Sequence, residues 1–592
     1  MVGSLPNDMK PLAFLGVETS LSGRRWTGPA GEEIRLSEAM VQATGLDAAV
    51  CRVLTARGVA CEEALGYLTP TLRELLPDPR SLRDMGIAAE RIVRAMAAGE
   101  RIAIFADYDV DGGASAALLL DWLRAQGRDA TLYVPDRIDE GYGPNPTAMR
   151  TLAGAHDLIV CVDCGTLSFE AIAAARGTDV VVIDHHLGAE TLPEALAIVN
   201  PNRQDETGDL GHLCAAAVVF LVLVEANRQL RDAGRATPNL MQMLDLVALA
   251  TVADVAPLIG VNRALVTQGL KVMAQRARPG LTALSDVAGL GTAPTAYHLG
   301  YVLGPRVNAG GRVGRANLGA RCLSARDPHE ARALADKLDE LNRERREIET
   351  AVRDAALAQA EARGLDGPLV WAAGEGWHPG VVGIVAARLK EATNRPAVVI
   401  GLEGGVGKGS GRSVHGVDLG HAIQRLAAEG LLLKGGGHRM AAGLTVEQDR
   451  IEDAMARLGD LLAREGAGST GPRDLRLDAP LMPGAATPEL VARIEAAGPF
   501  GQGSPAPRFA FPDVAILNCR QVGANHLKVS FGDGLGARLD GIAFDAWESP
   551  LGQALAGHGG ARFHLAGRIE VSHWGGRQRV ELRLEDAARA GS

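Results

Sequence analysis

The stretch IAIFADYDVDG, residues 102–112, joins five apolar residues to three carboxylates. The apolar run has the length and composition of a buried strand, and Asp107, Asp109 and Asp111 follow it before a helix expected from about Gly113. Two like charges ~4 Å apart repel by about 4 kcal/mol at an effective dielectric of about 20, so clustered aspartates raise one another's pKa unless a cation neutralises them. The stretch therefore predicts a strand, an acidic cation-binding turn and a helix.

An EF-hand calcium loop opens with the same spacing of aspartates and glycine. That loop also needs an aliphatic residue two places after the glycine and a bidentate glutamate at its end. The chain has Ala114 and Leu118 at those places, and a strand rather than a helix precedes the turn. These differences argue against an EF-hand.

Three further apolar runs end at acidic or histidine residues. The run 157–162 leads to Asp163, the run 179–183 leads to Asp184, His185 and His186, and Asp254 ends the run 246–253. In open α/β sheets, ligands bind beyond the carboxyl ends of the parallel strands, so these turns can converge on one crevice. Oxygen ligands with one or two imidazoles favour manganese or magnesium over a structural zinc.

The order of segments predicts an α/β protein of several domains. Strand-like and helical runs alternate from about residue 102 to 257, which indicates a doubly wound parallel sheet. Asp327 and Pro328 form a good start for a long charged helix, after which a second, smaller α/β module begins. Short alternating segments near the carboxyl end predict a β-barrel. We expect a loosely packed lead-in at 1–45, a catalytic domain at 46–325, a connecting helix at 326–364, a substrate-binding domain at 365–468 and a barrel at 469–592.

Composition is typical of an enzyme from a reducing compartment. The seven cysteines are odd in number and scattered, and the first residues lack the layout of a signal peptide, so we expect a cytoplasmic protein. The longest apolar run, 214–224, is too short to cross a bilayer. The net charge of −10 requires any contact with nucleic acid to be local. Arginine outnumbers lysine, which indicates either phosphate recognition or genomic base composition.

Several motifs resemble a known family. The segments DYDVDG, CVDCG, DHH and ADVAPL, at 107–112, 161–165, 184–186 and 253–258, resemble the four signatures of the DHH phosphoesterases. Within that superfamily the chain is similar to the RecJ-type single-strand-specific exonucleases. The resemblance extends through LGPRVNAGGRVG at 303–314, WHPGVVGIVAARL at 377–389, GSGRS at 409–413 and GGGHRMAAG at 435–443. It implies a DHH core, a DHHA1 substrate-binding domain and an OB-like barrel.

The resemblance also implies a centre with two Mn²⁺ or Mg²⁺ ions. The expected metal ligands are Asp107, Asp109, Asp111, Asp163, His185 and Asp254. Asp163 is expected to bridge the ions, and Asp163 and Asp109 are expected to take part in catalysis with His186, which would contact the phosphate or the leaving oxygen. The sequence leaves open which of the first three aspartates contacts metal directly. Asp184 is expected to orient a histidine.

Two glycine-rich regions are expected to contact the substrate. Arg306, Asn308 and Arg312 are predicted to lie in a flexible basic loop, whose alternative role is ion pairing with nearby carboxylates. In the second lobe the expected contacts are Ser410, Arg412, Gly436, Gly437 and His438, on glycine-rich turns that could otherwise serve packing. Phe531, Trp547 and Trp574 are possible stacking platforms on the barrel, and core or loop packing is their alternative role.

The leading functional hypothesis is a metal-dependent, processive exonuclease that acts on single-stranded DNA. The resemblance implies 5′ to 3′ polarity, 5′-mononucleotide products, a role in recombination and repair, and single-strand-binding protein and a helicase as partners. A small-substrate phosphoesterase that hydrolyses cyclic dinucleotides or very short oligonucleotides is the alternative. A catalytically silent DNA-binding scaffold is a third possibility.

Overall fold

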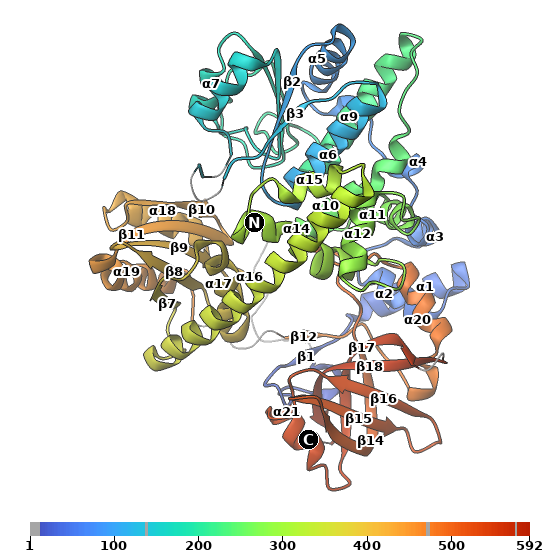
Figure 1. Ribbon diagram of the computed structural model, residues 1–592. Helices are drawn as coiled ribbons and strands as arrows, with labels where there is room; N and C mark the ends of the chain where they lie inside the picture. The colour runs from blue at the N-terminus through green and yellow to red at the C-terminus, as the bar shows by residue number, and fades with distance from the viewer. Residues whose placement is uncertain (1–11, 137–139, 142, 469–473, 575–576, 592) are drawn as a thin grey trace, which may run out of the picture. The chain divides into compact units, whose positions relative to one another are not determined.

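The computed structural model describes residues 12–136, 140–141, 143–468, 474–574 and 577–591 (Figure 1). Contacts divide the chain into two compact units. One contains Leu72–Gly471, and the other joins Met1–Thr71 to Pro472–Ser592. The described amino-terminal residues, from 12 onward, therefore belong with the carboxyl-terminal barrel, whereas the sequence predicts a separate lead-in.

The first lobe of the larger unit is built on a parallel sheet. Its strands are β3 (Thr131–Tyr133), β2 (Ile102–Ala106), β4 (Leu158–Val162), β5 (Asp179–Ile183) and β6 (Ala197–Val199), in that spatial order. The chain passes from β3 on one side of β2 to β4 on the other side, so the topological switch point lies between β2 and β4. The predicted parallel sheet is confirmed, and its ligand-binding edge is where the acidic turns lie.

Helices cover both faces of this sheet. Ile102 and Ile104 pack with α5 (Met85–Ala98), α6 (Val110–Ala125) and α9 (Ala215–Asp232). Ala103 and Phe105, which point to the other face, pack with α7 (Pro146–Ala155) and α8 (Phe169–Ala174). Figure 1 shows α7 on one side of β2 and β3 and α5 on the other. The doubly wound prediction is therefore confirmed, because continuous apolar strands need cover on both faces.

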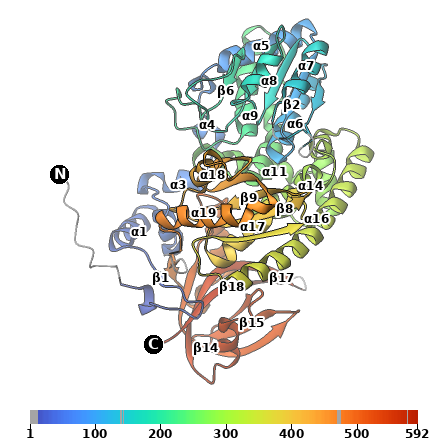
Figure 2. The same ribbon diagram turned by 90° about the vertical axis from the view of Figure 1, so that its left-hand side faces the viewer.

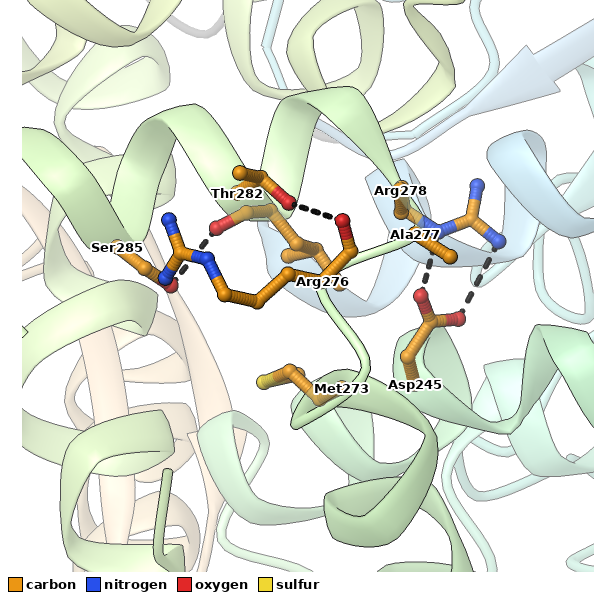
Figure 3. A pocket seen from close by; sticks show the side chains of 8 residues that line it. Asp245, Met273, Arg276, Ala277, Arg278, Thr282 and Ser285 are labelled. Atoms are coloured by element: carbon orange, nitrogen blue, oxygen red, sulfur yellow. Dashed lines mark hydrogen bonds and ion pairs between the residues drawn. The ribbon is translucent and has the colours of Figure 1, made fainter. Parts of the chain in front are cut away.

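A helical layer follows the sheet. It consists of α10 (Leu244–Ala253), α11 (Gly260–Met273), α12 (Pro279–Val287), α14 (Gly304–Val313) and α15 (Leu318–Ser324). The nearly buried Arg278 joins α10, α6 and α15, since its guanidinium binds Asp245 at 2.8 Å, Asp121 on α6 and the carbonyl of Leu323. Figure 3 shows the pair of Arg278 and Asp245. The cavity beside it, about 10 Å³, has room for about one water molecule. A buried arginine is tolerable here because two carboxylates balance its charge.

The predicted connecting helix is α16 (Pro328–Arg363). Asp327 caps it by accepting N–H bonds from residues 329 and 330, and Pro328 takes the first helical position. Leu334 and Leu338 belong to the core of the first lobe, whereas Val352 and Ala356 belong to the core of the second. The helix thus links the two lobes of this unit.

The second lobe is a mixed sheet between two helical layers. Its strands are β10 (Lys434–His438), β11 (Ala441–Glu447), β9 (Val406–Arg412), β8 (Ala397–Glu403) and β7 (Val370–Glu375), in that spatial order. One face packs with α17 (Pro379–Thr393), and the other packs with α18 (Leu419–Ala428) and α19 (Ile451–Arg464).

The predicted glycine-rich turns of this lobe are wrong. Gly436 and Gly437 lie inside β10, and Ser410 and Arg412 lie inside β9. A Cβ on Gly437 would lie 2.5 Å from the carbonyl oxygen of Ala441 on the neighbouring strand. Some of these glycines therefore allow close packing within a sheet and do not form a turn.

The smaller unit contains the expected OB-like barrel. Its strands are β14 (Phe509–Val522), β15 (His526–Gly532), β16 (Arg538–Ala543), β18 (Arg577–Arg589) and β17 (Arg562–Trp574), and pairing of β14 with β17 closes the barrel. Most pairs are antiparallel, but β16 and β18 are parallel. Closure leaves no free edge on these strands, as an OB-fold requires.

The expectation of a loosely packed amino-terminal lead-in is wrong for the residues that the structure describes. β1 (Trp26–Thr27) pairs with β12 (Leu475–Arg476), and α1 (Gly31–Thr44) and α2 (Ala48–Thr55) contribute to the barrel core. Figure 2 shows β1, coloured blue, beside the red strands of the barrel. Trp26 is fully buried and its Nε1–H donates to Asp586 at 2.9 Å. The sequence concealed this packing because α1 buries only Ser37 and Met40, too few for a readable periodicity.

Within the described ranges, no helix is both long enough and apolar enough to span a membrane.

Candidate metal centre

The acidic turn after β2 is fixed by its own helix. Oδ1 of Asp109 accepts N–H bonds from Asp111 at 2.9 Å and Gly112 at 3.1 Å, so Asp109 caps α6. The helix begins at Val110, three residues before the predicted start, because this cap satisfies its first amides. Gly112 is required, since a Cβ there would lie 2.4 Å from the carbonyl oxygen of Asp107.

Asp111 is held by a second helix. Its two carboxylate oxygens accept N–H bonds from Ala215 at 2.7 Å and Ala216 at 2.8 Å, the first residues of α9. The positive end of that helix favours an anion. Burial nevertheless raises the pKa of Asp111, and the neighbouring charge of Asp109 raises it further. The side chain is therefore oriented firmly but needs positive charge nearby.

Asp163 stands at the end of β4 in a strained conformation. Its φ of 60° lies in the left-handed region, which aspartate adopts at a cost of order 1 kcal/mol or more. The N–H of Asp163 donates to the carbonyl of Ile183 at 3.0 Å, which holds the residue against β5. Burial raises the pKa of Asp163 well above its usual range, and the charges of Asp111 and Asp109 add to the effect.

His185, at the end of β5, lies among three carboxylates. Its Nε2 is 3.3 Å from Oδ1 of Asp163, 3.7 Å from Oδ2 of Asp111 and 3.8 Å from Oδ2 of Asp254. Asp254 follows α10, and burial together with the charge of Asp111 raises its pKa to about 8. Four segments far apart in the sequence therefore converge at the switch point of the sheet.

The donor atoms fit divalent cations. Among the described residues, three groups bring their ligand atoms within 4.8 Å of one another: Asp163 with His185 and His186, Asp111 with His185 and Asp254, and Asp107 with Asp109 and Asp163. All six predicted metal ligands occur in these groups, and Asp163 occurs in two of them. Carboxylates crowded enough to raise their own pKa values are neutralised by a bound cation, and the donor set suits manganese or magnesium.

His186 is paired with Asp184. Its Nδ1 lies 2.8 Å from Oδ1 of Asp184, whose carboxylate also accepts the N–H groups of Thr166 and His185. Burial lowers the pKa of His186, but the hydrogen bond to Asp184 and the charges of Asp184, Asp254 and Asp107 together outweigh burial and raise the pKa to about 9. The His186 side chain is 38% exposed and that of His185 is 16% exposed, so His186 is the more accessible of the two.

Two asparagines that the sequence analysis missed hold the histidine turn. The side-chain amide of Asn200 donates to the carbonyl of His186 at 2.8 Å, and that of Asn202 donates to the carbonyl of His185 at 2.6 Å. Both residues follow β6 directly. Like β2, β4 and β5, this strand ends beside the site. Polar residues directly after the apolar run 197–199 were the available signal.

The predicted flexible basic loop is wrong, because Arg306, Asn308 and Arg312 lie on α14. Nε of Arg306 donates to Asp339 at 2.9 Å, and Nη1 of Arg312 donates to the carbonyl of Gly380 on α17 at 3.1 Å. Oδ1 of Asn308 accepts the N–H of Val110 at 3.0 Å, so Asn308 supports the acidic turn.

The glycines of α14 serve packing. A Cβ on Gly311 would lie 2.9 Å from the ring of Tyr108 and one on Gly310 would lie 3.2 Å from Leu338. Close approach to the acidic turn and to α16, and not flexibility, explains why this helix is rich in glycine.

The predicted substrate residues of the second lobe lie on its sheet. Nη1 of Arg412 donates to Oγ of Ser410 at 2.9 Å, and both side chains lie beside Gly383 of α17. Arg412 pairs with Ala441 on β11, which in turn pairs with His438 on β10. Arg412 and His438 therefore share one row across the sheet.

Two of the suggested stacking platforms of the barrel are not exposed, and the side chain of the third, Trp574, lies outside the described residues. Phe531 is fully buried, and Trp547 packs against the barrel core. Among the described side chains of the barrel, Phe544 is an exposed aromatic residue, and its ring lies 5.2 Å from the ring of His526 and 5.2 Å from the guanidinium of Arg583. It follows β16 directly, and no alternation in the sequence distinguished it from core residues.

Known sequence families match three parts of the chain. Residues 101–251 match the DHH family, N-terminal domain; residues 366–464 match the DHHA1 domain; and residues 477–586 match the RecJ OB domain. The three matches follow the order of the sheet with the acidic centre, the second lobe and the barrel.

Curated relatives match nearly the whole chain. The single-stranded-DNA-specific exonuclease RecJ of Dickeya dadantii (strain 3937) is 39% identical over 568 residues, which are 91% of this chain and 96% of the relative. The protein of the same name from Escherichia coli (strain K12) is 37% identical over 557 residues, 90% of this chain and 95% of the relative.

Solved structures of RecJ are also similar to this chain. RecJ from Thermus thermophilus in complex with Mn²⁺ has a TM-score of 0.78 and 29% identity, and the match covers 95% of this chain and 79% of that chain. The same protein with Mg²⁺ gives a TM-score of 0.72 at 28% identity, covering 95% and 78% of the two chains.

Proposed function

Because this chain belongs to the family of RecJ single-stranded-DNA-specific exonucleases, we propose that it hydrolyses phosphodiester bonds of single-stranded DNA with Mn²⁺ or Mg²⁺ as cofactor. The observation that carries the proposal is the set of Asp111, Asp163 and Asp254 oxygens within 4 Å of one His185 nitrogen. Such a set suits a phosphoesterase centre, and it lies at the switch point of a doubly wound sheet.

In this reaction the chain's own residues bind the metal ions and supply a proton or a hydrogen bond. Two divalent ions, when bound, supply an activated water and a sink for charge on the departing oxygen. Asp107, Asp109, Asp111, Asp163, His185 and Asp254 would hold them, with Asp163 shared between the two positions. His186, which Asp184 keeps protonated, would donate a hydrogen bond or a proton to the phosphate or to the leaving oxygen.

The finer features of the reaction are part of the same proposal. We propose 5′ to 3′ polarity, 5′-mononucleotide products and a role in recombination and repair, with single-strand-binding protein and a helicase as partners. Arg306, Asn308, Arg312, Ser410, Arg412, Gly436, Gly437 and His438 are the proposed substrate contacts. The bonds of Arg306 to Asp339 and of Asn308 to Val110 indicate that these two act mainly by positioning α14 and the acidic turn.

One assay tests the proposal. Single-stranded DNA labelled at either end, duplex DNA, RNA and a cyclic dinucleotide are each incubated with the full chain and Mn²⁺, and the products are identified. We expect labelled mononucleotide to appear first from the 5′ label on single-stranded DNA. Early release of the 3′ label would overturn the polarity, and preference for the cyclic dinucleotide would overturn the substrate class. Metal binding by calorimetry without hydrolysis of any substrate would indicate a DNA-binding scaffold.

A further inference from the structure

The sheet of the second lobe is covered only in part on its α17 face. Ala397 and Val399 of β8 pack with α17, and their partners on β9, Arg412 and Ser410, point to the same face. Beyond β9 this face continues over β11 and β10, where Gly443, Lys434 and His438 are exposed. The opposite face of these strands is closed by α18 and α19. The α17 face is therefore open over β11 and β10.

The strand register sorts the open part into rows. One row holds Arg412, Ala441 and His438, and the next holds Ser410, Gly443 and Gly436. The third row holds Lys408, Thr445 and Lys434. Two cationic rows thus flank a row of small residues, against which an extended polymer can pack closely.

The third row is a cluster of charge without acidic partners. Lys408 and Lys434 are both exposed, and among the described residues no ion pair joins either ammonium to a carboxylate. The next row, with Glu403 and Glu447, is acidic and ends the cationic surface. The chain has only seven lysines and a net charge of −10. Two lysines on either side of one threonine therefore form a locally positive site in an acidic protein.

The spacing of the rows suits a polynucleotide backbone. Successive rows are two residues apart along a strand, about 6.8 Å, which is comparable with the repeat of an extended nucleotide chain. Lysine contacts phosphate as a point charge, and the threonine hydroxyl between the lysines can donate a hydrogen bond to the same group.

We infer that Lys408, Thr445 and Lys434 form a second phosphate-binding row, which holds the sugar–phosphate backbone of single-stranded DNA one step beyond the row of Arg412 and His438. The inference rests on the proposed function, because it extends the path of the same substrate. Through this row the second lobe contacts a neighbouring nucleotide, so the protein binds long strands more tightly than dinucleotides.

Lysine footprinting tests this row directly. The metal-free full chain is treated with an acetylating reagent with and without a 20-nucleotide oligothymidylate, and modification of each lysine is read by mass spectrometry. Lys408 and Lys434 should be protected, whereas the exposed Lys271 and Lys337 should not. Bound oligonucleotide that leaves Lys408 and Lys434 reactive would overturn the row while leaving the proposed function intact. No binding at all would instead count against the proposed function.

Salt dependence supplies a second measurement. Each phosphate contact on a single strand contributes about 0.7 to the slope of log affinity against log salt, or about fivefold in affinity at 0.1 M salt. The variant K408Q/K434Q should therefore lose about 25-fold in affinity and about 1.4 in slope, while K408R/K434R and the control K337Q should keep both. An unchanged slope in K408Q/K434Q would refute the inference.

Discussion

Nε2 of His185 lies 3.3 Å from Oδ1 of Asp163, although the two residues end different strands of the parallel sheet. The contact exists because β4 and β5 are neighbours in register, with Val162 opposite Ile183, so their next residues leave the sheet at the same edge. The left-handed φ of Asp163 then turns its chain away from the strand direction. The centre is therefore a product of sheet topology and not of any local motif.

Replacing Asp163 should separate activity from folding. Asp163→Asn removes the carboxylate shared by two groups of donor atoms, so we expect less than a tenth of the wild-type hydrolysis rate with Mn²⁺. The metal-free variant should be at least as stable as the wild type, because burial and neighbouring carboxylates already disfavour the charged side chain. Product release from labelled DNA and thermal unfolding without metal check the two parts. A rate above a tenth of wild type would exclude the bridging role.

Metal binding should release protons at neutral pH. The pKa of Asp254 in the metal-free protein is about 8, so this carboxyl is mostly protonated at pH 7 and must ionise to bind a cation. The affinity for Mn²⁺ should therefore rise by about tenfold per pH unit for each displaced proton, and level off above about pH 8.

Calorimetry in buffers of different ionisation enthalpy measures these protons. Asp254→Asn should bind Mn²⁺ more weakly and release fewer protons than the wild type. For the same reason the metal-free wild type should lose stability as the pH rises from about 4, the ordinary pKa of aspartate, to about 8, and this loss should be smaller in the variant. Equal proton release in both proteins would contradict the assignment of Asp254.

The pair of His186 and Asp184 should set the alkaline limit of activity. Burial lowers the pKa of His186, but the hydrogen bond to Asp184 and the nearby carboxylate charges raise it to about 9 in the metal-free protein, and bound cations lower it from there. A protonated His186 is required in the proposed mechanism, so kcat should fall as the pH rises through this pKa. Asp184→Asn removes the stabilising charge and should move the fall in kcat to lower pH.

The pH profile of kcat for the wild type and for Asp184→Asn gives the shift. His186→Gln is the matched control, because it should lower kcat at every pH while it keeps most of the affinity for Mn²⁺. Loss of Mn²⁺ binding in His186→Gln would make His186 a metal ligand, as its place beside Asp163 and His185 also allows.

The sequence predicted those parts of the site that follow from strand order. Asp163 and His185 follow apolar runs, and the rule that parallel strands present their carboxyl ends at one edge of the sheet was enough to predict that these residues lie close together. The bonds from Ala215 and Ala216 to Asp111 could not be predicted, because backbone amides carry no sequence signature and lie more than 100 residues away. Long-range partners of this kind depend on where whole helices pack.

Glycine was the main source of error. The sequence predicts a flexible basic loop around Gly311 and a glycine-rich turn around Gly437, but the first segment is helical and the second is a strand. In both places a Cβ would meet a neighbouring segment within 3 Å. A glycine needed for close packing and a glycine needed for a turn have the same appearance in a single sequence.

The amino-terminal segment should contribute to the stability of the barrel unit. Trp26 is fully buried against Asp586, so Trp26→Ala should destabilise this unit by about 3–5 kcal/mol. Leu36→Ala, at a residue of α1 that is 55% exposed, is the control and should change stability little. Urea unfolding followed by circular dichroism measures the difference. Equal stability of the two variants would show that the segment is not part of the barrel core in solution.

Two adjacent glycines of β10 can separate folding from substrate binding. A Cβ on Gly437 would lie 2.5 Å from backbone atoms of Ala441 and Ala442, so Gly437→Ala should disrupt the pairing of β10 with β11 and lower the melting temperature. A Cβ on Gly436 would meet no atom within 4 Å, so Gly436→Ala should fold normally.

Because Gly436 shares its row with Ser410 on the open face, its new methyl group would stand where we propose that the DNA backbone lies. We therefore expect Gly436→Ala to keep the wild-type melting temperature but to bind oligothymidylate more weakly. Wild-type affinity in Gly436→Ala would indicate that the strand does not approach this row.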